Sequence, residues 1–224
     1  MHIPDGFLSP AICGATYVIS LLVVGYSLGK IKGGLDERIV PMTALLTALF
    51  FAAQMMNYPI IGGTTAHLLG GASLALVLGP YVGCVCMTVI LILQCLLFGD
   101  GGITALGANL LTMAVIGTFL PYYIYKLTMG ATKNRAVSAA IGAFLGDLTA
   151  AVTAGILLGF SAPIFQYGLE IAVPAMAINH SIIGAGEAIV TAALITLLTG
   201  AKPELMKISP WLGEARGSPE VKTK

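Results

Sequence analysis

The sequence has very little charge. Only 9% of its 224 residues are Asp, Glu, Lys or Arg, whereas 57% are hydrophobic; an ordinary soluble domain carries roughly 25% charged residues. So few charged side chains cannot form the polar coat of a soluble protein of this size, so lipid is expected to cover much of the surface. The formal net charge of +1 indicates no nucleic-acid partner and no strongly acidic one.

Several motifs are also missing. No CxxC pair occurs among the four cysteines, which all lie in apolar stretches (Cys13, Cys84, Cys86 and Cys95). We interpret them as small buried residues, with thiolate metal ligands as the alternative. The sequence contains no P-loop of the GxxxxGK[ST] form, so an ATP-driven cycle would need a separate ATPase. It also shows no internal repeat, which disfavours a stand-alone alternating-access carrier.

Long apolar runs fill most of the chain instead. A helix needs about 20 mainly apolar residues to cross a bilayer, and seven segments are candidates: 11–31, 39–57, 64–79, 81–98, 103–126, 136–160 and 178–200. The third segment is short, and Gly79-Pro80 predicts a helix end or sharp kink before the fourth. The sequence therefore predicts an all-α integral membrane protein. We expect a terminal segment at 1–10, a transmembrane domain at 11–202 and a polar cytoplasmic tail at 203–224.

The basic residues predict the orientation. They lie between the first and second spans, between the fifth and sixth, and in the tail (Lys30, Lys32, Arg38, Lys126, Lys133, Arg135, Lys202, Lys207, Arg216, Lys222 and Lys224). The loops at 58–63, 99–102 and 161–177 contain neither Lys nor Arg. Seven spans with the N-terminus outside place every basic residue in the cytoplasm, as the positive-inside rule requires.

Small residues four positions apart recur within the spans. The pairs are Gly25/Gly29, Gly79/Gly83, Gly142/Gly146 and Gly155/Gly159. Such pairs let the backbones of neighbouring helices approach closely in lipid. We therefore expect a tightly packed bundle.

The first two residues, Met1 and His2, form a potential chelator. The free α-amine, the amide nitrogen of residue 2 and the His2 Nδ1 close a five-membered and then a six-membered ring around one metal ion. Ni²⁺ and Cu²⁺ accept planar nitrogen donors, and a fourth nitrogen would complete the square. Met1 is expected to remain, because a bulky second residue blocks its removal and no signal-peptide pattern precedes the first span. A histidine at position 2 can also be a chance neighbour of the start codon.

Other polar residues lie in apolar surroundings, where they usually face the bundle interior. His67 follows the run Gly62-Gly63-Thr64-Thr65 and is the candidate for the fourth ligand. Four residues are candidates for orienting the ligands or offsetting the metal charge: Asn109, His180, Glu187 and Asp100. The alternative for each is interhelical hydrogen bonding. The role of Asp147, in the middle of the sixth span, stays open.

Long blocks of the sequence resemble one family. MHIPDGFLSP, GGTTAHLLGGASLALVLGP (62–80), LQCLLFGDGGITALGANLLTMAVIG (93–117) and HSIIGAGEAIVTA (180–192) are similar to the CbiM/NikM family, in the order the family has them. Members of this family are the substrate-binding (S) components of energy-coupling-factor (ECF) transporters for cobalt and nickel, in prokaryotic cell membranes. FGDGGITALGAN is far more specific than any short motif.

The resemblance implies a seven-helix bundle, with the N-terminal segment tucked into the substrate site from outside. It implies Ni²⁺ held in a plane by the terminal amine of Met1, the amide and imidazole of His2, and His67. It also implies a transmembrane coupling subunit, cytoplasmic ABC-type ATPases and a small accessory membrane subunit as partners. The opening MHIPDGFLSP favours nickel over Co²⁺, since the cobalt branch commonly begins MHIMEGFLP.

Two other classes of protein are alternatives. A membrane-embedded metal-dependent enzyme would need an open coordination position and a positioned acid or base, such as Glu187 near His180. However, no HExxH or similar compact catalytic motif occurs. A passive channel would show repeated polar residues lining one helix, and no span has them. The sequence therefore predicts a transport subunit and not an enzyme.

Overall fold

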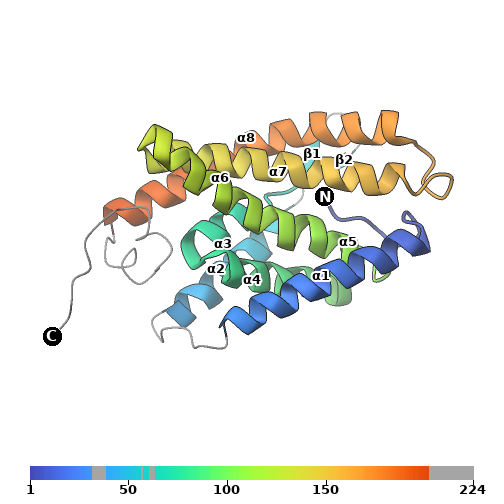
Figure 1. Cartoon of the computed structure of the whole chain (residues 1–224), viewed down its shortest axis with the longest axis horizontal. Coiled ribbons are helices and arrows are strands. Elements are labelled where there is room, and N and C mark those ends of the chain that lie inside the picture. Colours follow the sequence, from blue (N-terminus) through green and yellow to red (C-terminus); the bar gives the residue numbers. More distant parts are fainter. Residues whose placement is uncertain (32–38, 57, 61–63, 202–224) are drawn as a thin grey trace.

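The computed structural model describes residues 1–31, 39–56, 58–60 and 64–201, and Figure 1 shows them as a bundle of helices. The predicted tail at 203–224 and the basic residues at 32, 38 and beyond 201 lie outside the described residues. The helices are α1 (Pro10–Ile31), α2 (Ile39–Met55), α3 (Gly71–Leu78), α4 (Pro80–Leu93), α5 (Leu106–Asn109), α6 (Gly117–Thr132), α7 (Arg135–Gly159) and α8 (Leu169–Ala201). Two stretches are π-helical, η1 (Gln94–Phe98) and η2 (Leu110–Ile116), and a hairpin pairs β1 (Tyr58–Ile60) with β2 (Thr64–Ala66).

Five continuous helices of the described chain are long and apolar enough to cross a membrane: Pro10–Ile31, Pro80–Phe98, Leu106–Thr132, Arg135–Gly159 and Leu169–Ala201. The second and third of these run through η1 and η2. The helix α2 is apolar but has only 17 residues. The chain is thus a multi-pass helical membrane protein, as predicted, while the count of seven spans and the outside N-terminus stay predictions.

The predicted span at 64–79 is wrong in its extent. The helix α3 has eight residues, and β2 and an extended segment precede it. Gly70 has a φ of 77°, and a Cβ there would meet the Phe50 ring. This left-handed residue delays the helix, because only glycine adopts such a backbone conformation without strain. The predicted break at Gly79-Pro80 is confirmed, because α3 ends at Leu78 and α4 begins at Pro80.

The predicted loop at 161–177 is also partly wrong, since α8 begins at Leu169. Its first turns are apolar apart from Glu170, and Pro174 lies among them. A proline removes one backbone hydrogen bond, and near the start of a 33-residue helix that loss does not end the helix.

Glycines bring the helices of the bundle together, as the spacing predicts. A Cβ on Gly142 would lie 2.7 Å from the carbonyl oxygen of Pro121 in α6, and one on Gly159 would lie 2.8 Å from the Leu169 Cα. In contrast, nothing lies within 4 Å of such an atom on Gly25 or Gly29. The close packing therefore involves α6, α7 and α8, whereas these two glycines of α1 face open space.

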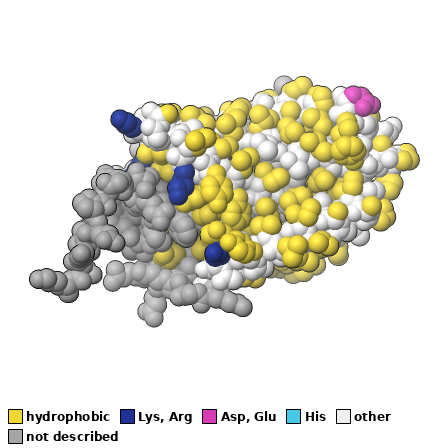
Figure 2. All heavy atoms as spheres, viewed as in Figure 1, with side chains coloured by type: hydrophobic (Ala, Val, Ile, Leu, Met, Phe, Trp, Pro, Cys, Tyr) yellow, Lys and Arg dark blue, Asp and Glu magenta, His cyan; other side chains and the backbone are white. Residues whose placement is uncertain are grey.

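The surface matches a protein that lies in lipid. Figure 2 shows hydrophobic side chains over most of the visible face, with Lys and Arg gathered at the left end and acidic side chains at the other. On α1, Leu21 is 58% and Leu22 is 69% exposed. All eight residues of α3, in contrast, are buried. The bundle therefore has a buried interior around α3 and an apolar outer wall.

Candidate metal centre

The first three residues are fixed inside the bundle by hydrogen bonds to their backbone. Asn109, at the end of α5, accepts a hydrogen bond from the Ile3 N–H at 2.8 Å and donates its amide group to the Ile3 carbonyl oxygen at 3.1 Å. The Gly102 N–H donates to the same carbonyl at 2.9 Å. Ile3 itself is buried. Because both backbone groups of Ile3 are bound, the two residues before it have a defined position.

A second contact anchors the segment at residue 5. The Asp5 carboxylate accepts hydrogen bonds from the Ile103 N–H at 3.1 Å and from the Thr104 N–H at 2.7 Å. It also accepts one from the Thr104 hydroxyl, and this bond above all lowers the pKa of Asp5. Gly102 packs so closely on Asp5 that a side chain there would collide with it. The glycines of the loop 99–102 thus let the N-terminal segment approach.

The terminal amine of Met1 meets His67. Its nitrogen lies 3.0 Å from the His67 Nε2. The other ring nitrogen, Nδ1, lies 3.2 Å from the Leu68 carbonyl oxygen, which only accepts. Nδ1 therefore carries the proton, and the lone pair of Nε2 points at the amine. A histidine fixed in this way presents the nitrogen that a metal requires.

The His2 imidazole is oriented from both sides. Its Nε2 lies 3.0 Å from the Gln94 Oε1, and its Nδ1 lies 3.4 Å from the Asp100 Oδ1. The Gln94 oxygen only accepts, so the proton is on Nε2 and the Nδ1 lone pair is free. Asp100 is too far for a strong hydrogen bond, and its negative charge lies next to that lone pair. The His2 and His67 ring centroids are 4.9 Å apart.

These positions suit a four-nitrogen plane. In a chelate of the amine, the residue-2 amide and Nδ1, the amine and Nδ1 occupy opposite corners with the amide between them. A fourth ligand must then lie next to the amine and to Nδ1. Two donors bound at right angles, each about 2 Å from a metal, are about 2.8 Å apart. The separation of 3.0 Å between the Met1 nitrogen and His67 Nε2 is close to this value.

Burial keeps the donor nitrogens unprotonated. It lowers the pKa of the Met1 amine to about 6, although the charges of Asp147 and Asp100 act against it. Burial and the neighbouring amine lower the pKa of His2 to about 4 and that of His67 to about 2. At neutral pH the amine and both imidazoles are therefore mostly neutral, and metal binding has few protons to displace from them.

The segment that carries His67 is itself supported. The Glu187 carboxylate accepts hydrogen bonds from the backbone N–H groups of Leu69 and Gly70, the latter at 2.7 Å. From α2, the Gln54 side-chain amide donates to the Leu69 carbonyl oxygen at 2.6 Å. Both supporting side chains are buried. They fix the residues that follow His67, and so its position opposite Met1.

Not every predicted residue reaches the nitrogens directly. Asn109 and Asp100 contact residues 1–3, and Glu187 acts through the segment 69–70. His180 is buried, and its Nδ1 lies 3.0 Å from the Met176 carbonyl oxygen of its own helix. It lies close enough to lower the pKa of His67, although burial lowers that pKa most. The structure thus brings together the predicted metal residues and their predicted supports.

The sequence analysis missed Gln94, Gln54 and Asp5. Each glutamine is a polar residue inside an apolar helix and is fully buried, and a polar residue within a span generally marks an interior or functional position. Gln94 also opens the π-helical stretch η1, a kind of distortion common at functional sites. Asp5 gave no such signal, because it lies in an exposed loop.

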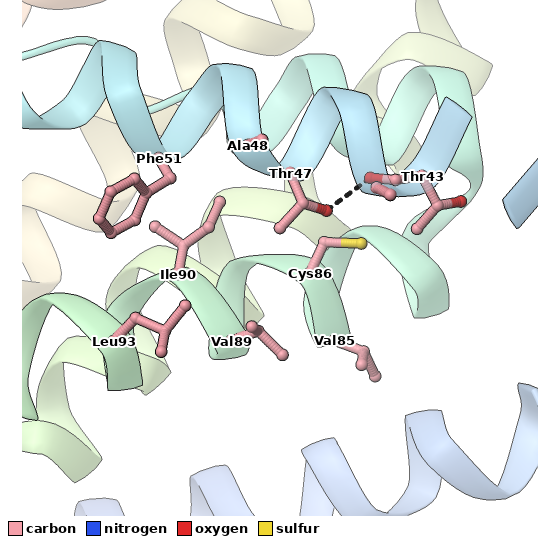
Figure 3. A pocket seen from close by; sticks show the side chains of 10 residues that line it. Thr43, Thr47, Ala48, Phe51, Val85, Cys86, Val89, Ile90 and Leu93 are labelled. Carbon is pink, nitrogen blue, oxygen red and sulfur yellow. Dashed lines mark hydrogen bonds between the residues drawn. The ribbon is translucent and has the colours of Figure 1, made fainter. Parts of the chain in front are cut away.

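The alternative thiolate site finds no support. Among the described residues, no group of three or more His, Cys, Asp or Glu side chains is arranged to hold a metal ion. Cys84, Cys86 and Cys95 are buried. Figure 3 shows Cys86 in a groove of about 480 Å³ between α2 and α4, whose other lining residues are Thr43, Ala44, Thr47, Ala48, Phe51, Val85, Val89, Ile90 and Leu93. This groove contains no histidine.

Comparison with known proteins places the chain beside metal transporters. Residues 2–205 match the family model CbiM, described as "Cobalt uptake substrate-specific transmembrane region". The chain is 42% identical to the putative fused nickel transport protein NikMN of Archaeoglobus fulgidus, over 92% of this chain and 68% of that protein. It is 40% identical to the fused nickel transport protein NikMN of Rhodobacter capsulatus, over 92% of this chain and 64% of that one. It thus spans about two thirds of these fused relatives.

A solved structure agrees in fold. A crystal structure described as that of a truncated transition metal transporter superposes with a TM-score of 0.84 at 39% sequence identity. The match covers 90% of this chain and 99% of that one.

Proposed function

The chain belongs to the CbiM family of substrate-specific transmembrane regions of metal uptake, and from that premise we propose that it captures Ni²⁺ for an ATP-driven ECF transporter. The metal is bound by four nitrogens in a plane: the Met1 amine, the His2 amide and Nδ1, and the His67 Nε2. As a membrane component of nickel and cobalt transport, the chain is a transport protein and not an enzyme.

The observation that carries this proposal is the 3.0 Å approach of the Met1 amine to His67 Nε2. Residues 66 positions apart in the chain meet there, and the hydrogen bonds on the opposite ring nitrogens leave His67 Nε2 and His2 Nδ1 unprotonated. Two hydrogen-bonded imidazoles and an amine of lowered pKa form a site prepared for a cation.

The donor set favours nickel over cobalt. Planar nitrogen coordination, including an ionised amide, is a geometry that Ni²⁺ accepts readily. Two similar relatives are named as nickel transport proteins, although the family model is named for cobalt. Co²⁺ is the alternative substrate, and a competition experiment distinguishes the two ions.

The transport step requires partners. The sequence has no P-loop, so ATP hydrolysis belongs to separate cytoplasmic ABC-type ATPases, linked through a transmembrane coupling subunit and accompanied by a small accessory membrane subunit. In this scheme Ni²⁺ enters from outside and binds to the N-terminal segment, which is already held in the bundle. The coupling subunit then drives release towards the cytoplasm.

The decisive experiment adds three alanines before Met1, with the initiator methionine removed, because a single added residue would still let the amine, two amides and the His2 Nδ1 chelate a planar metal ion together. The extension moves the free amine away from His2 and breaks the first chelate ring. We expect Ni²⁺ affinity, measured by calorimetry on the purified chain, to fall more than about 100-fold, since even changes outside the ligand shell cost about 10- to 100-fold. Mass spectrometry establishes which N-terminus each protein carries.

A matched variant, His67→Ala, keeps the natural N-terminus and removes the fourth nitrogen. It should lose binding to a similar degree, while both proteins keep the thermal stability of the apo form. Unchanged Ni²⁺ binding by the extended protein would disprove the terminal amine as a ligand. Tighter binding of Co²⁺ than of Ni²⁺ by the natural chain would instead establish the cobalt alternative.

A further inference from the structure

The centre of α7 carries a carboxylate without a partner. Asp147 is 3% exposed, and neither of its oxygens has a hydrogen-bond partner. Burying a polar group without a hydrogen-bond partner costs several kcal/mol, and burying an unpaired charge costs more. In its ionised form, such a group needs a positive charge nearby to compensate it.

Asp147 faces the part of α8 that lies behind the metal centre. A Cβ on Gly184 would lie 3.4 Å from the Asp147 Oδ2, so the carboxylate packs against α8 between His180 and Glu187. Asp147 also raises the pKa of the Met1 amine more than Asp100 does, although burial lowers that pKa by more.

The proposed ligand set leaves one positive charge in excess. Ni²⁺ brings two positive charges, the ionised His2 amide removes one, and the amine and two imidazoles are neutral. The excess lies inside the bundle, where water screens it little. A buried charge of this kind needs a compensating charge nearby.

The other acidic side chains near the site are less suited to this task. Glu187 accepts the backbone hydrogen bonds of Leu69 and Gly70. The Asp100 side chain is 26% exposed, so solvent weakens its interaction. Asp147 is buried and free of hydrogen bonds.

We infer that Asp147 is the counter-ion of the occupied metal site, a positioning residue that compensates the excess charge without binding the metal itself. This inference rests on the proposed function. In this arrangement, α7 supplies the negative charge that balances a divalent ion bound through an ionised amide.

The test compares Asp147→Asn and Asp147→Leu with Glu170→Gln. Asp147→Asn removes the charge with little change in volume and is the variant whose melting temperature is compared. Asp147→Leu removes both the charge and the polar atoms with a larger side chain, and Glu170→Gln removes an exposed charge in the first turn of α8. We expect both Asp147 variants to bind Ni²⁺ about 10- to 100-fold more weakly. At saturating metal they should retain the absorption band of planar Ni²⁺, and the apo form of Asp147→Asn should melt no lower than the natural protein. The Glu170 variant should bind normally.

Two results would overturn the inference. One is an Asp147 variant whose affinity lies within twofold of that of the Glu170 variant. The other is a lowered apo melting temperature or an altered absorption band, because either would indicate that Asp147 positions the helices and not the charge. The alanine extension separates the two proposals: if it abolishes binding while Asp147→Asn does not, the ligand set stands and only the counter-ion role fails.

Discussion

Two regions of the bundle differ in nearly every respect. Around Met1, polar groups from η1, the loop 99–102, α5 and His67 hold residues 1–3 in place. The groove between α2 and α4 (Figure 3) is almost wholly apolar, with Thr43, Thr47 and Cys86 as its polar exceptions. Thr47 donates its hydroxyl to the Thr43 carbonyl oxygen of its own helix at 2.7 Å.

The difference teaches that an open volume does not identify the site in this protein. The proposed metal centre is instead marked by ring nitrogens whose protonation is set by neighbouring hydrogen-bond acceptors. The groove has an open volume but no imidazole nitrogen in its lining. Its apolar surface between two helices suits a lipid chain or an apolar side chain. Changes of charge around Met1 should therefore alter Ni²⁺ affinity strongly, and substitutions in the groove should alter it very little.

The largest expected effect is the dependence of Ni²⁺ affinity on pH. Metal binding that ionises the His2 amide releases one proton, so affinity should fall about tenfold per pH unit. Below the Met1 amine pKa of about 6, a second proton must be displaced and the fall should steepen. His2 and His67, with pKa values of about 4 and 2, stay neutral and add nothing.

Calorimetry at pH values from 7.5 to 5.5 should therefore show a loss of at least about 100-fold, since one released proton gives about tenfold per unit. Repeating the titration in buffers of different ionisation enthalpy counts the released protons directly. A Ni²⁺ affinity that does not change with pH would rule out an ionised amide as ligand.

Much of this architecture could be predicted from the sequence. The long apolar runs predicted membrane-spanning helices, and Gly79-Pro80 predicted the break before α4. The nitrogens of Met1 and His2 are adjacent in the chain, so their chelate geometry follows from bond counting alone. The prediction failed where tertiary contacts decide: the left-handed Gly70 shortens α3, and α8 continues through Pro174 to Leu169.

The supports of the site were harder to predict than the ligands. Asn109, Asp100 and Glu187 stood out as polar residues beside glycines. Gln94 and Gln54 lie in different helices, and their partners, His2 and the Leu69 carbonyl, are distant in sequence. A sequence indicates that such a residue is buried, but not which of many backbone and side-chain groups it contacts. The assignment of the His2 tautomer therefore needed the structure.

A smaller effect is expected from Gln94→Leu, which removes the acceptor of the His2 Nε2–H. Without that acceptor the imidazole loses its orientation, and Ni²⁺ affinity should fall about tenfold, in the range of outer-shell changes. The control is Thr88→Val in the same continuous helix Pro80–Phe98, whose hydroxyl donates to the Cys84 carbonyl oxygen at 2.8 Å and contacts no residue of the proposed metal centre. The control should bind normally, and equal losses in the two variants would contradict the role of Gln94.

The smallest effect is expected in the groove. Cys86→Ala and Thr47→Val remove its thiol and one of its hydroxyls without touching any nitrogen of the metal centre. Ni²⁺ affinity should stay within about twofold of the natural value, while the lost packing of Cys86 lowers stability by about 1 kcal/mol, as for a small buried group. Thermal melting in detergent measures the second effect and calorimetry the first. A tenfold loss of Ni²⁺ affinity in Cys86→Ala would instead support the thiolate alternative. The distinction between the two regions would then fail, because both would contribute ligands to one metal.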